Sequence, residues 1–408
     1  MDSERSRRFL EGTINRNVIV LSLTSMVSTF FLSLWQGYIP LYLRGVGLSV
    51  SSIGLLLTLG AITVALASFV AGSLGDYLGR KFMIVVSTIT LAFAPIALSF
   101  SFIYYIVLGL LLFYWSTSAL QPNFRALITE SVDKAYRGRA LGFLNSMSVA
   151  LTAVSFIVSG LILHAAEPAS YVGRMSTILL LSGIVIMLVA LFRGLFIRET
   201  KKGSKTPLST IAMRNVMPLR DRFLKLLTIA YIIHDAGLSL VMFMVPLYAQ
   251  YIGMNSLLIG IMFALNSIVM LITQIPFGRL ADKSGRTRVI VISFVLEALA
   301  IGSMVLVQNP VFLISVYGIW VAVGQMDMPA LGALLADLSR QEDRATIMGG
   351  FSGLTTIASI PAPFVGGLIF SFYPSILGGY LIPFVLSFIM LAAGAIIAIF
   401  YRVKVYSK

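Results

Sequence analysis

Long apolar runs alternate with short polar segments over nearly the whole chain. Twelve such runs can be counted, at residues 18–43, 51–74, 82–101, 102–128, 140–165, 174–197, 224–251, 255–278, 287–307, 310–336, 345–371 and 375–401. Each run has the roughly 20 residues that an α-helix needs to cross about 30 Å of hydrocarbon. Because backbone groups inside a bilayer find no water, they must bond within their own segment. The pattern therefore predicts an all-α membrane protein with twelve transmembrane helices.

A charged motif between the second and third runs returns between the eighth and ninth. The first copy is Gly72-Ser-Leu-Gly-Asp-Tyr-Leu-Gly-Arg80-Lys81, and the second, 206 residues later, is Gly278-Arg-Leu-Ala-Asp-Lys-Ser-Gly-Arg286. Pro40-Leu-Tyr42 likewise returns as Pro246-Leu-Tyr248. Matches at a nearly constant offset indicate a tandem duplication of six helices, with both halves entering the membrane from the same side. We predict a first bundle at 1–197, a cytoplasmic linker at 198–222 and a second bundle at 223–408.

The charge of the chain indicates orientation in the membrane rather than a nucleic-acid partner. The net charge is +14, but only 11% of the 408 residues are charged, against roughly 25% in soluble proteins. Of the 30 basic residues, only Arg44, Arg125 and Arg174 fall away from one set of loops and helix ends. Lys and Arg accumulate on the cytoplasmic side. We therefore expect both termini in the cytoplasm, a plasma-membrane location in the lipid bilayer, and no nucleic acid.

Several chemistries are excluded by what the sequence lacks. There is no cysteine and there are only two histidines, so disulfides and thiolate metal sites are excluded. Neither a His-Glu-x-x-His motif nor a phosphate-binding Gly-x-x-x-x-Gly-Lys-Ser/Thr loop is present, which argues against a metalloenzyme and an ATP-driven pump. We expect no enzyme activity, no cofactor and no metal.

Residues 72–81 match the pattern Gly-x-Leu-x-Asp-x-x-Gly-Arg-Lys at every fixed position. With this motif the chain resembles the major facilitator superfamily, whose signature lies between helices 2 and 3. The twelve helices, the long central connector and the degenerate second signature also fit, so the resemblance covers essentially the whole chain. It implies two pseudo-symmetric six-helix bundles and a secondary transporter that moves a small-molecule substrate by alternating access. We expect it to act as a monomer.

The resemblance implies that the two signature motifs form a conformational latch. In the family, the carboxylate of the signature meets helix 11 of the opposite half when the cytoplasmic side is shut, and Arg80 is expected to reach Glu130. The alternative is that these charges only anchor the loops at the membrane surface. The latch residues are Gly72, Asp76, Gly79, Arg80 and Glu130 in the first half and Gly278, Asp282, Gly285, Arg286 and Asp337 in the second.

Two carboxylates inside spans are candidates for proton coupling, because charge within a membrane is costly and usually functional. Asp235 lies in helix 7 and Asp327 in helix 10, next to a kink expected at Pro329. In the family these helices, with 1 and 4, surround the central cavity. Desolvation favours the protonated form of a carboxyl group, which suits proton uptake and release. The alternative for each is a static interhelical hydrogen bond.

Two other ionisable residues in the spans receive different expectations. Glu297 lies in helix 9, which is an outer helix in the family, so we expect it to make a packing or interhelical contact. His234 precedes Asp235 but points about 100° away around the helix, so no dyad is expected.

Polar and aromatic side chains in the cavity helices are candidates for substrate binding, since a few polar groups in an apolar pocket suit a small molecule. Trp and Tyr near helix ends also serve as interface anchors. Arg125 either attracts a substrate carboxylate or extends to the headgroups. The candidates are Gln36, Tyr38, Trp115, Gln121, Asn123, Arg125, His234 and Gln325.

The substrate stays open at this point. The drug:proton antiporter branch is the nearest in character, and it suggests proton-coupled efflux of amphipathic compounds. The chain departs from that branch, because Ser155-Phe-Ile-Val-Ser-Gly160 lacks the helix-5 proline of its motif and Leu110 stands where the branch has arginine. The alternatives are uptake or facilitated diffusion of an organic anion, a sugar or another metabolite, or a non-transporting sensor on the same scaffold.

Overall fold

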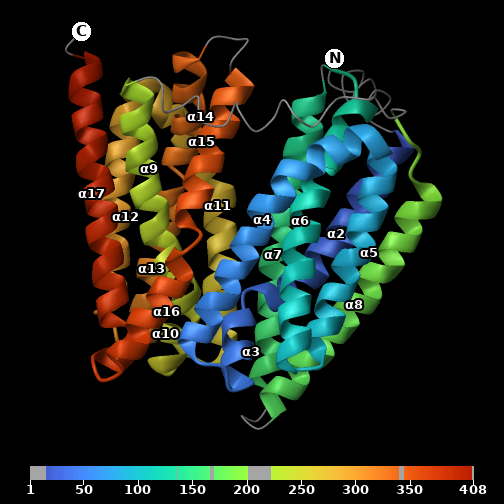
Figure 1. Ribbon diagram of the computed structural model, residues 1–408, viewed down its shortest axis with the longest axis horizontal. Coiled ribbons are helices and arrows are strands. Elements are labelled where there is room, and N and C mark those ends of the chain that lie inside the picture. The colour runs from blue at the N-terminus through green and yellow to red at the C-terminus, as the bar shows by residue number, and fades with distance from the viewer. Residues whose placement is uncertain (1–14, 135, 166–169, 201–221, 340–343, 407–408) are drawn as a thin grey trace. The chain divides into compact units, whose positions relative to one another are not determined.

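The computed structural model describes residues 15–134, 136–165, 170–200, 222–339 and 344–406. Within these ranges, twelve helical segments are long and apolar enough to cross a membrane, as the hydropathy pattern predicts. Most of the predicted linker, residues 201–221, lies outside the described residues. In chain order the elements (Figure 1) are α2 (Arg16–Gln36), α3 (Ile39–Gly45), α4 (Val50–Leu78), α5 (Arg80–Ser99), α6 (Ile103–Ser131), α7 (Arg137–His164), α8 (Tyr171–Phe196), α9 (Arg222–Val241), η5 (Met242–Met244), α10 (Val245–Tyr251), α11 (Ser256–Ser284), α12 (Arg286–Met304), α13 (Pro310–Gly324), α14 (Asp327–Leu338), α15 (Arg344–Ser359), α16 (Ala362–Phe372), η6 (Leu377–Gly379) and α17 (Leu381–Tyr406).

The helices form two compact units. Unit 1 comprises residues 1–39 and 63–208, and unit 2 comprises residues 40–62 and 209–408. The helix α4 therefore belongs to unit 2 up to Ile62 and to unit 1 from Thr63 onward. The bundle boundaries expected from the sequence, at 197 and 223, stay a prediction.

The same packing neighbours recur in the two units. In unit 1, α5 packs against α6 and α8, and α2 packs against α7 and α8. In unit 2, α12 packs against α13, α14 and α17, while α9 packs against α15, α16 and α17. If α13–α14 and α15–α16 each count as one broken helix, the third helix of each repeat contacts the fourth and sixth. The duplication in the sequence thus returns as a repeated pattern of contacts.

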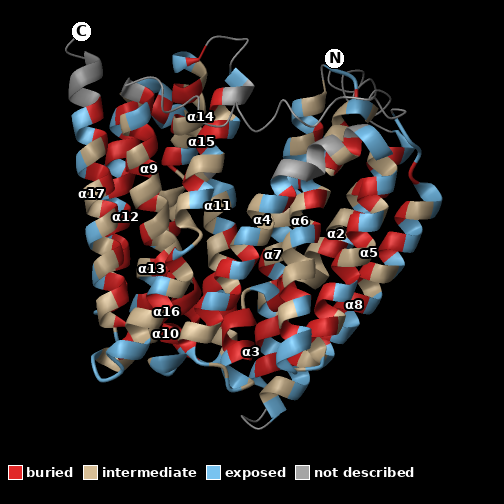
Figure 2. Ribbon diagram, in the orientation of Figure 1, coloured by how far each residue is buried: buried red, intermediate tan, exposed pale blue. Residues whose placement is uncertain are grey.

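The outer helices expose apolar stripes of the kind that lipid requires. Exposed leucine and isoleucine side chains recur every three to four residues on α8, at Leu181, Ile184, Leu188, Leu191 and Leu195. This spacing places them on one face of a helix. Figure 2 shows exposed positions alternating with buried ones along α8 and α17. Because acyl chains are as apolar as leucine, such a face is stable in a membrane without protein cover.

Four of the predicted spans are broken rather than continuous. The breaks lie at residues 37–38, 242–244, 325–326 and 360–361. At the third of these, the sequence predicts a kink at Pro329, whereas the structure ends α13 at Gly324 and starts α14 at Asp327. A proline has no N–H to donate to the carbonyl four residues earlier, which here belongs to Gln325. The disruption therefore falls one turn before the proline.

A threonine on α4 forms hydrogen bonds with backbone groups at the break between α15 and α16. The Thr58 hydroxyl donates to the Ile360 carbonyl at 3.0 Å and accepts the Phe364 N–H at 3.2 Å. On the same face, the backbone of Gly54 lies so close to Pro363 that a Cβ at Gly54 would overlap the Pro363 carbonyl. Unpaired backbone groups are costly in a water-free layer. Within unit 2, Thr58 thus bonds one carbonyl and one N–H group that the interruption of the helix leaves without a partner inside the helix.

Candidate functional site

Four ionisable side chains from three helices lie together inside unit 2. The helix α9 carries His234 and Asp235, α12 carries Glu297, and α14 carries Asp327. His234 Nδ1 lies 3.2 Å from Asp235 Oδ1, and His234 Nε2 lies 3.7 Å from Glu297 Oε1. The structure differs from the sequence-based expectation for one pair, because His234 and Asp235 are in contact although their Cβ directions diverge. Glu297 is buried and contacts His234 of another helix, which agrees with the packing or interhelical contact expected for it.

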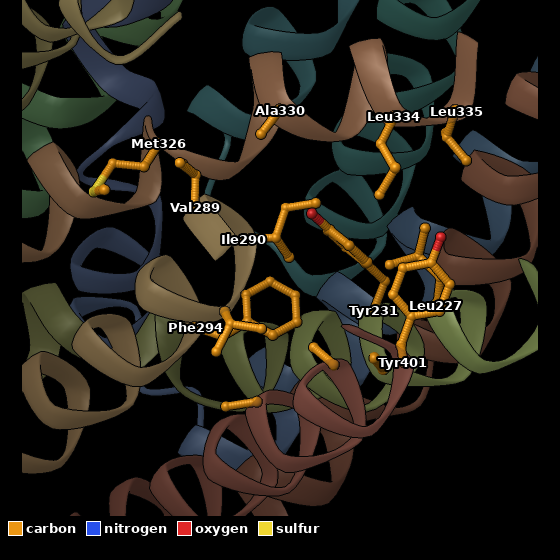
Figure 3. Close-up of a cluster of buried hydrophobic side chains, with 14 of the residues drawn as sticks. Leu227, Tyr231, Val289, Ile290, Phe294, Met326, Ala330, Leu334, Leu335 and Tyr401 are labelled. Atoms are coloured by element: carbon orange, nitrogen blue, oxygen red, sulfur yellow. The ribbon is translucent and has the colours of Figure 1, made fainter. Parts of the chain in front are cut away.

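Tyr231 links the fourth member of the cluster to α9. Its hydroxyl donates to Asp327 Oδ2 at 3.2 Å, and Asp327 also interacts electrostatically with Glu297, His234 and Asp235. Figure 3 shows Tyr231 and Phe294 packed among the apolar side chains of unit 2. The imidazole of His234 stacks on the Phe294 ring, with centroids 3.8 Å apart and planes 8° from parallel. An apolar core thus surrounds the imidazole and fixes its orientation.

Exposure divides the cluster into an accessible end and a buried end. The Asp235 side chain is 36% exposed, whereas the side chains of His234 and Glu297 are each 3% exposed. Asp327 is also buried. Both proton-coupling candidates from the sequence, Asp235 and Asp327, lie in this cluster, and their role in coupling stays a prediction.

The first signature motif is mostly helical, and only its end is a turn. The helix α4 runs through Gly72 to Leu78, and Gly79 follows with φ +100° before α5 begins. L-residues with a side chain rarely adopt this φ, so glycine is required for the turn. The side chain of Asp76 lies outside the described part of the structure.

The arginine of this motif contacts the residue predicted for it. Arg80 Nε lies 3.7 Å from Glu130 Oε1, and Arg80 Nη1 donates to Asn123 Oδ1 at 3.3 Å. Asn123, a predicted cavity residue, is fully buried. Its amide therefore lies beside the signature arginine.

A carboxylate that was not a candidate from the sequence caps the N-terminus of α5. Glu199, three residues beyond α8, accepts the backbone N–H groups of Arg80 at 3.1 Å and Lys81 at 3.0 Å. Its neighbour Thr200 donates its hydroxyl to Glu130. An anionic side chain at a helix N-terminus satisfies free N–H groups and interacts favourably with the helix dipole. The first residues after α8 therefore form part of the signature region.

Replacing Glu199 by glutamine should lower the stability of unit 1. We expect a loss of about 1 kcal/mol in the free energy of unfolding, because a charged cap is exchanged for a neutral one. The measurement is thermal unfolding of the purified protein in detergent at neutral pH. Asp133→Asn is the matched control, since it removes an exposed carboxylate from the same unit. Equal unfolding temperatures for the two variants would show that the cap contributes nothing.

The second signature motif is similar in backbone but differs in its cap. Gly285 precedes α12 with φ +87°, and within the ranges that the structure describes no side chain is seen to accept a hydrogen bond at the start of that helix. Arg286 donates to the Ala333 carbonyl at 2.8 Å and pairs with Asp337. Asp282 is exposed, and Gly278 lies within α11. The Arg80–Glu130 contact is as the sequence predicts, and Arg286 and Asp337, which were assigned together to the second motif, form the equivalent pair. The role of these residues as a latch stays a prediction.

The remaining cavity candidates have varied surroundings. Gln36, Gln121 and Arg125 are exposed, Trp115 is 39% exposed, and Gln325 lies half-buried at the break between α13 and α14. Tyr38 is buried, and its hydroxyl donates to the Phe156 carbonyl at 3.3 Å. Among the described residues no group of three or more His, Asp or Glu side chains is arranged to hold a metal ion.

A buried arginine in unit 1 escaped the sequence analysis because it lies near the end of its span. Arg193 is 1% exposed, and its guanidinium donates to Thr24 Oγ1 at 3.0 Å, Thr88 Oγ1 at 2.8 Å and Ser25 Oγ at 3.3 Å. The two threonines donate in turn to carbonyls of their own helices. Arg193 therefore joins α2, α5 and α8 through hydroxyl groups. The sequence does not reveal that the hydroxyls of Thr24, Ser25 and Thr88 lie together around this arginine.

Comparison with known proteins places the chain in a family. The sequence profile of the Major Facilitator Superfamily matches residues 21–225 and 227–408. The multi-drug resistance efflux pump PmrA homolog of Lactococcus lactis subsp. lactis (strain IL1403) is 27% identical over 350 residues, which cover 83% of this chain and 84% of that protein. The multidrug resistance protein MdtG of Salmonella schwarzengrund (strain CVM19633) is 23% identical over 378 residues, covering 88% and 89%.

Solved structures agree in fold. A bacterial homolog of the human lysosomal transporter Spinster, in an inward-facing and unoccupied conformation, has a TM-score of 0.77 at 14% identity and covers 94% of this chain and 96% of that one. The nucleoside transporter NupG has a TM-score of 0.77 at 12% identity, covering 96% and 99%. The predicted all-α fold with twelve spans is confirmed. The chain therefore belongs to the Major Facilitator Superfamily and is a multi-pass membrane transporter.

Proposed function

We propose that the protein is a proton-coupled exporter of small amphipathic organic compounds, acting by alternating access in the plasma membrane with both termini in the cytoplasm. The observation that carries the coupling is the enclosed cluster of His234, Asp235, Glu297 and Asp327 in unit 2. Export is supported by the names of two relatives, an efflux pump and a multidrug resistance protein. The orientation is supported by the position of the basic residues in the sequence.

The composition of the cluster favours protons as the coupling ion. Three carboxyl groups face one imidazole, so the fully ionised cluster has an excess of negative charge even when the imidazole is protonated. Uncompensated charge in an apolar interior is costly. Taking up a proton removes part of that charge without any larger ion having to enter. A transporter with such a cluster exchanges protons readily between its conformational states.

Proteoliposomes with an imposed pH gradient test this function. The lumen is made about one pH unit more acidic than the medium, and the vesicles are given ethidium, a permanently charged aromatic cation. A one-unit difference supplies about 1.4 kcal/mol per proton, which sustains about a tenfold solute ratio in one-for-one exchange. A proton antiporter should therefore concentrate ethidium in the acidic lumen. Protein-free vesicles are the control.

The direction of movement separates the alternatives. Solute driven out of the acidic lumen would identify a symporter, and equilibration without accumulation would identify a facilitator. Binding without any flux, for a panel of cations, anions, sugars and nucleosides, would identify a sensor. Each of these three outcomes contradicts the proposed export by proton exchange.

Transport of an organic anion is the second candidate. It is favoured by Arg125, whose side chain is exposed within the span of α6 and is therefore available to a carboxylate. An anionic fluorophore in the same vesicles tests it. If the anion is transported and ethidium is not, and if Arg125→Gln abolishes that transport, this candidate replaces the first.

A further inference from the structure

We propose that His234 and Glu297 extend the coupling site into a proton relay, in which Glu297 is the inner proton acceptor and controls the break between α13 and α14. This inference rests on the proposed proton coupling. It adds two residues, one path and one structural consequence to the carboxylates predicted from the sequence. All the groups involved lie in unit 2.

The imidazole bridges an accessible carboxylate and a buried one. Its Nδ1 is 3.2 Å from Asp235, which is partly exposed, and its Nε2 faces Glu297 at 3.7 Å. Nε2 is buried, and it has no hydrogen-bond partner within the part of the chain that the structure describes. A ring nitrogen directed at a buried carboxylate, slightly beyond hydrogen-bond distance, is poised to transfer a proton when the gap shortens.

The transfer is balanced and reversible. Protonated Asp235 gives its proton to Nδ1 of the neutral imidazole, while Nε2–H gives its proton to the Glu297 carboxylate. The products are ionised Asp235, the other neutral tautomer of His234, and protonated Glu297. The return transfer restores the first tautomer. One uptake and one release per transport cycle therefore need no separate resetting of the ring.

Ser293 gives the proton on Glu297 a structural consequence. Its hydroxyl lies 3.0 Å from Glu297 Oε1 and 2.9 Å from the Val323 carbonyl, but it has a single hydrogen and can donate to only one of them. When Glu297 is ionised, its charge attracts that hydrogen, because charge-assisted bonds are the stronger ones. When Glu297 is protonated, it can donate to Ser293, which then donates to Val323.

The Val323 carbonyl lies at the break in the tenth span. It also accepts the Met326 N–H at 2.9 Å, and Gly324 lies against the Glu297 carboxylate, since a Cβ there would be 3.4 Å from Oε2. The proton on Glu297 therefore changes the hydrogen bonds of the segment that connects α13 to α14. That segment precedes Asp327 and contains Gln325, so the relay positions a coupling carboxylate and a candidate substrate contact.

Among the described residues, the ionisable groups that interact electrostatically with the relay are Tyr231 and Asp235 on α9 and Asp327 on α14. Two of the helices that pack on α9 place uncharged groups near these residues, namely Gly394 of α17 and Phe351 of α15. A pH-dependent change at the α13–α14 break would therefore be assigned to the cluster.

Trp320 provides a reporter that does not depend on transport. It lies on α13, one turn before Val323, and packs against Tyr317 with ring centroids 5.4 Å apart. In a background where Trp35 and Trp115 are phenylalanine, its emission is recorded from about pH 5 to about pH 9. We expect the emission to depend on pH in that background and to lose this dependence in Glu297→Gln and in Ser293→Ala. Tyr317→Phe is the control, because it alters the surroundings of Trp320 but leaves the relay intact.

Transport in the otherwise unchanged protein provides the second measurement. Glu297→Gln should lose accumulation driven by the pH gradient and keep ethidium exchange at zero gradient, whereas Glu297→Asp should restore part of the accumulation. A glutamine variant that keeps both the titration and the accumulation would overturn the relay alone. If the unsubstituted protein accumulates nothing, the proposed function fails, and the Trp320 titration still decides whether Glu297 controls the break.

Discussion

With Asp235 replaced by asparagine, vesicles should no longer hold a solute gradient against a pH gradient. Asp235 is the most accessible member of the cluster, and asparagine has nearly the same shape but cannot take up a proton in this pH range. For one-for-one exchange with a gradient of one pH unit, the accumulation ratio should fall from about ten to about one. The measurement is the steady-state ratio of ethidium between the lumen and the medium.

Ethidium exchange at equal pH distinguishes a variant that has lost proton coupling from one that is inactive or unfolded. Asp235→Asn should still exchange external for internal ethidium, since that half of the cycle needs no net proton movement. Asp133→Asn should behave like the unsubstituted protein, because Asp133 is an exposed carboxylate outside the spans. Full accumulation in Asp235→Asn would make the carboxylate a structural contact and remove the coupling role from it.

A single added methyl group at Gly366 should strongly destabilise unit 2. A Cβ at this position of α16 would overlap the Leu240 carbonyl of α9. Because the obstructing atom belongs to the backbone, no side-chain movement relieves the overlap, and the two helices have to separate. Overpacking of this kind costs about 1–3 kcal/mol. We expect Gly366→Ala to unfold at a clearly lower temperature in detergent.

Gly353 provides the matched control on α15. A Cβ there would have no atom within 4 Å, and alanine is favoured over glycine in a helix by up to about 1 kcal/mol. Gly353→Ala should therefore unfold at the same or a higher temperature. If both variants unfold together, the close approach of α9 and α16 does not limit the stability of the fold.

The spans were predictable because hydropathy is set by the segment itself. Residues 174–197 were expected to span the membrane, and the structure has a helix at Tyr171–Phe196. The breaks within spans were not predictable in the same way, since the break at 360–361 depends on Thr58, a residue about 300 positions away in the sequence. Local sequence specifies helix length, whereas a distant hydroxyl stabilises the interruption.

Pairs of opposite charge near helix ends were also predictable. Arg80 with Glu130 and Arg286 with Asp337 occupy equivalent positions in the two repeats, so each pair supported the other. Glu199 had no such support, because it lies 119 residues from Arg80 and belongs to no repeated motif. Its role depends on how the end of α8 meets the start of α5, which only the folded structure specifies.

The sequence predicted only two members of the acidic cluster, Asp235 and Asp327, and the reason is geometric. Helix periodicity separates the Cβ directions of His234 and Asp235 by about 100°, but both side chains are long enough to bend toward each other and meet at 3.2 Å. Glu297 was expected to make a packing or interhelical contact, but its partner His234 could not be named, because a helix at the periphery still has one face that points inward. Burial of an individual side chain depends on that face.

The contacts of Glu199 and Thr200 indicate that the first half of the molecule extends at least to residue 200. These two residues satisfy groups on α5 and α6 although they lie beyond the last residue of α8. A gene divided after Thr200 would encode an amino-terminal fragment in which the first N–H groups of α5 and the Glu130 carboxylate are already bonded. Division after Ile197 would remove Glu199 and Thr200 from that fragment and leave these groups without their partners. Co-expression of the two fragments should therefore give a folded protein after the first division but not after the second.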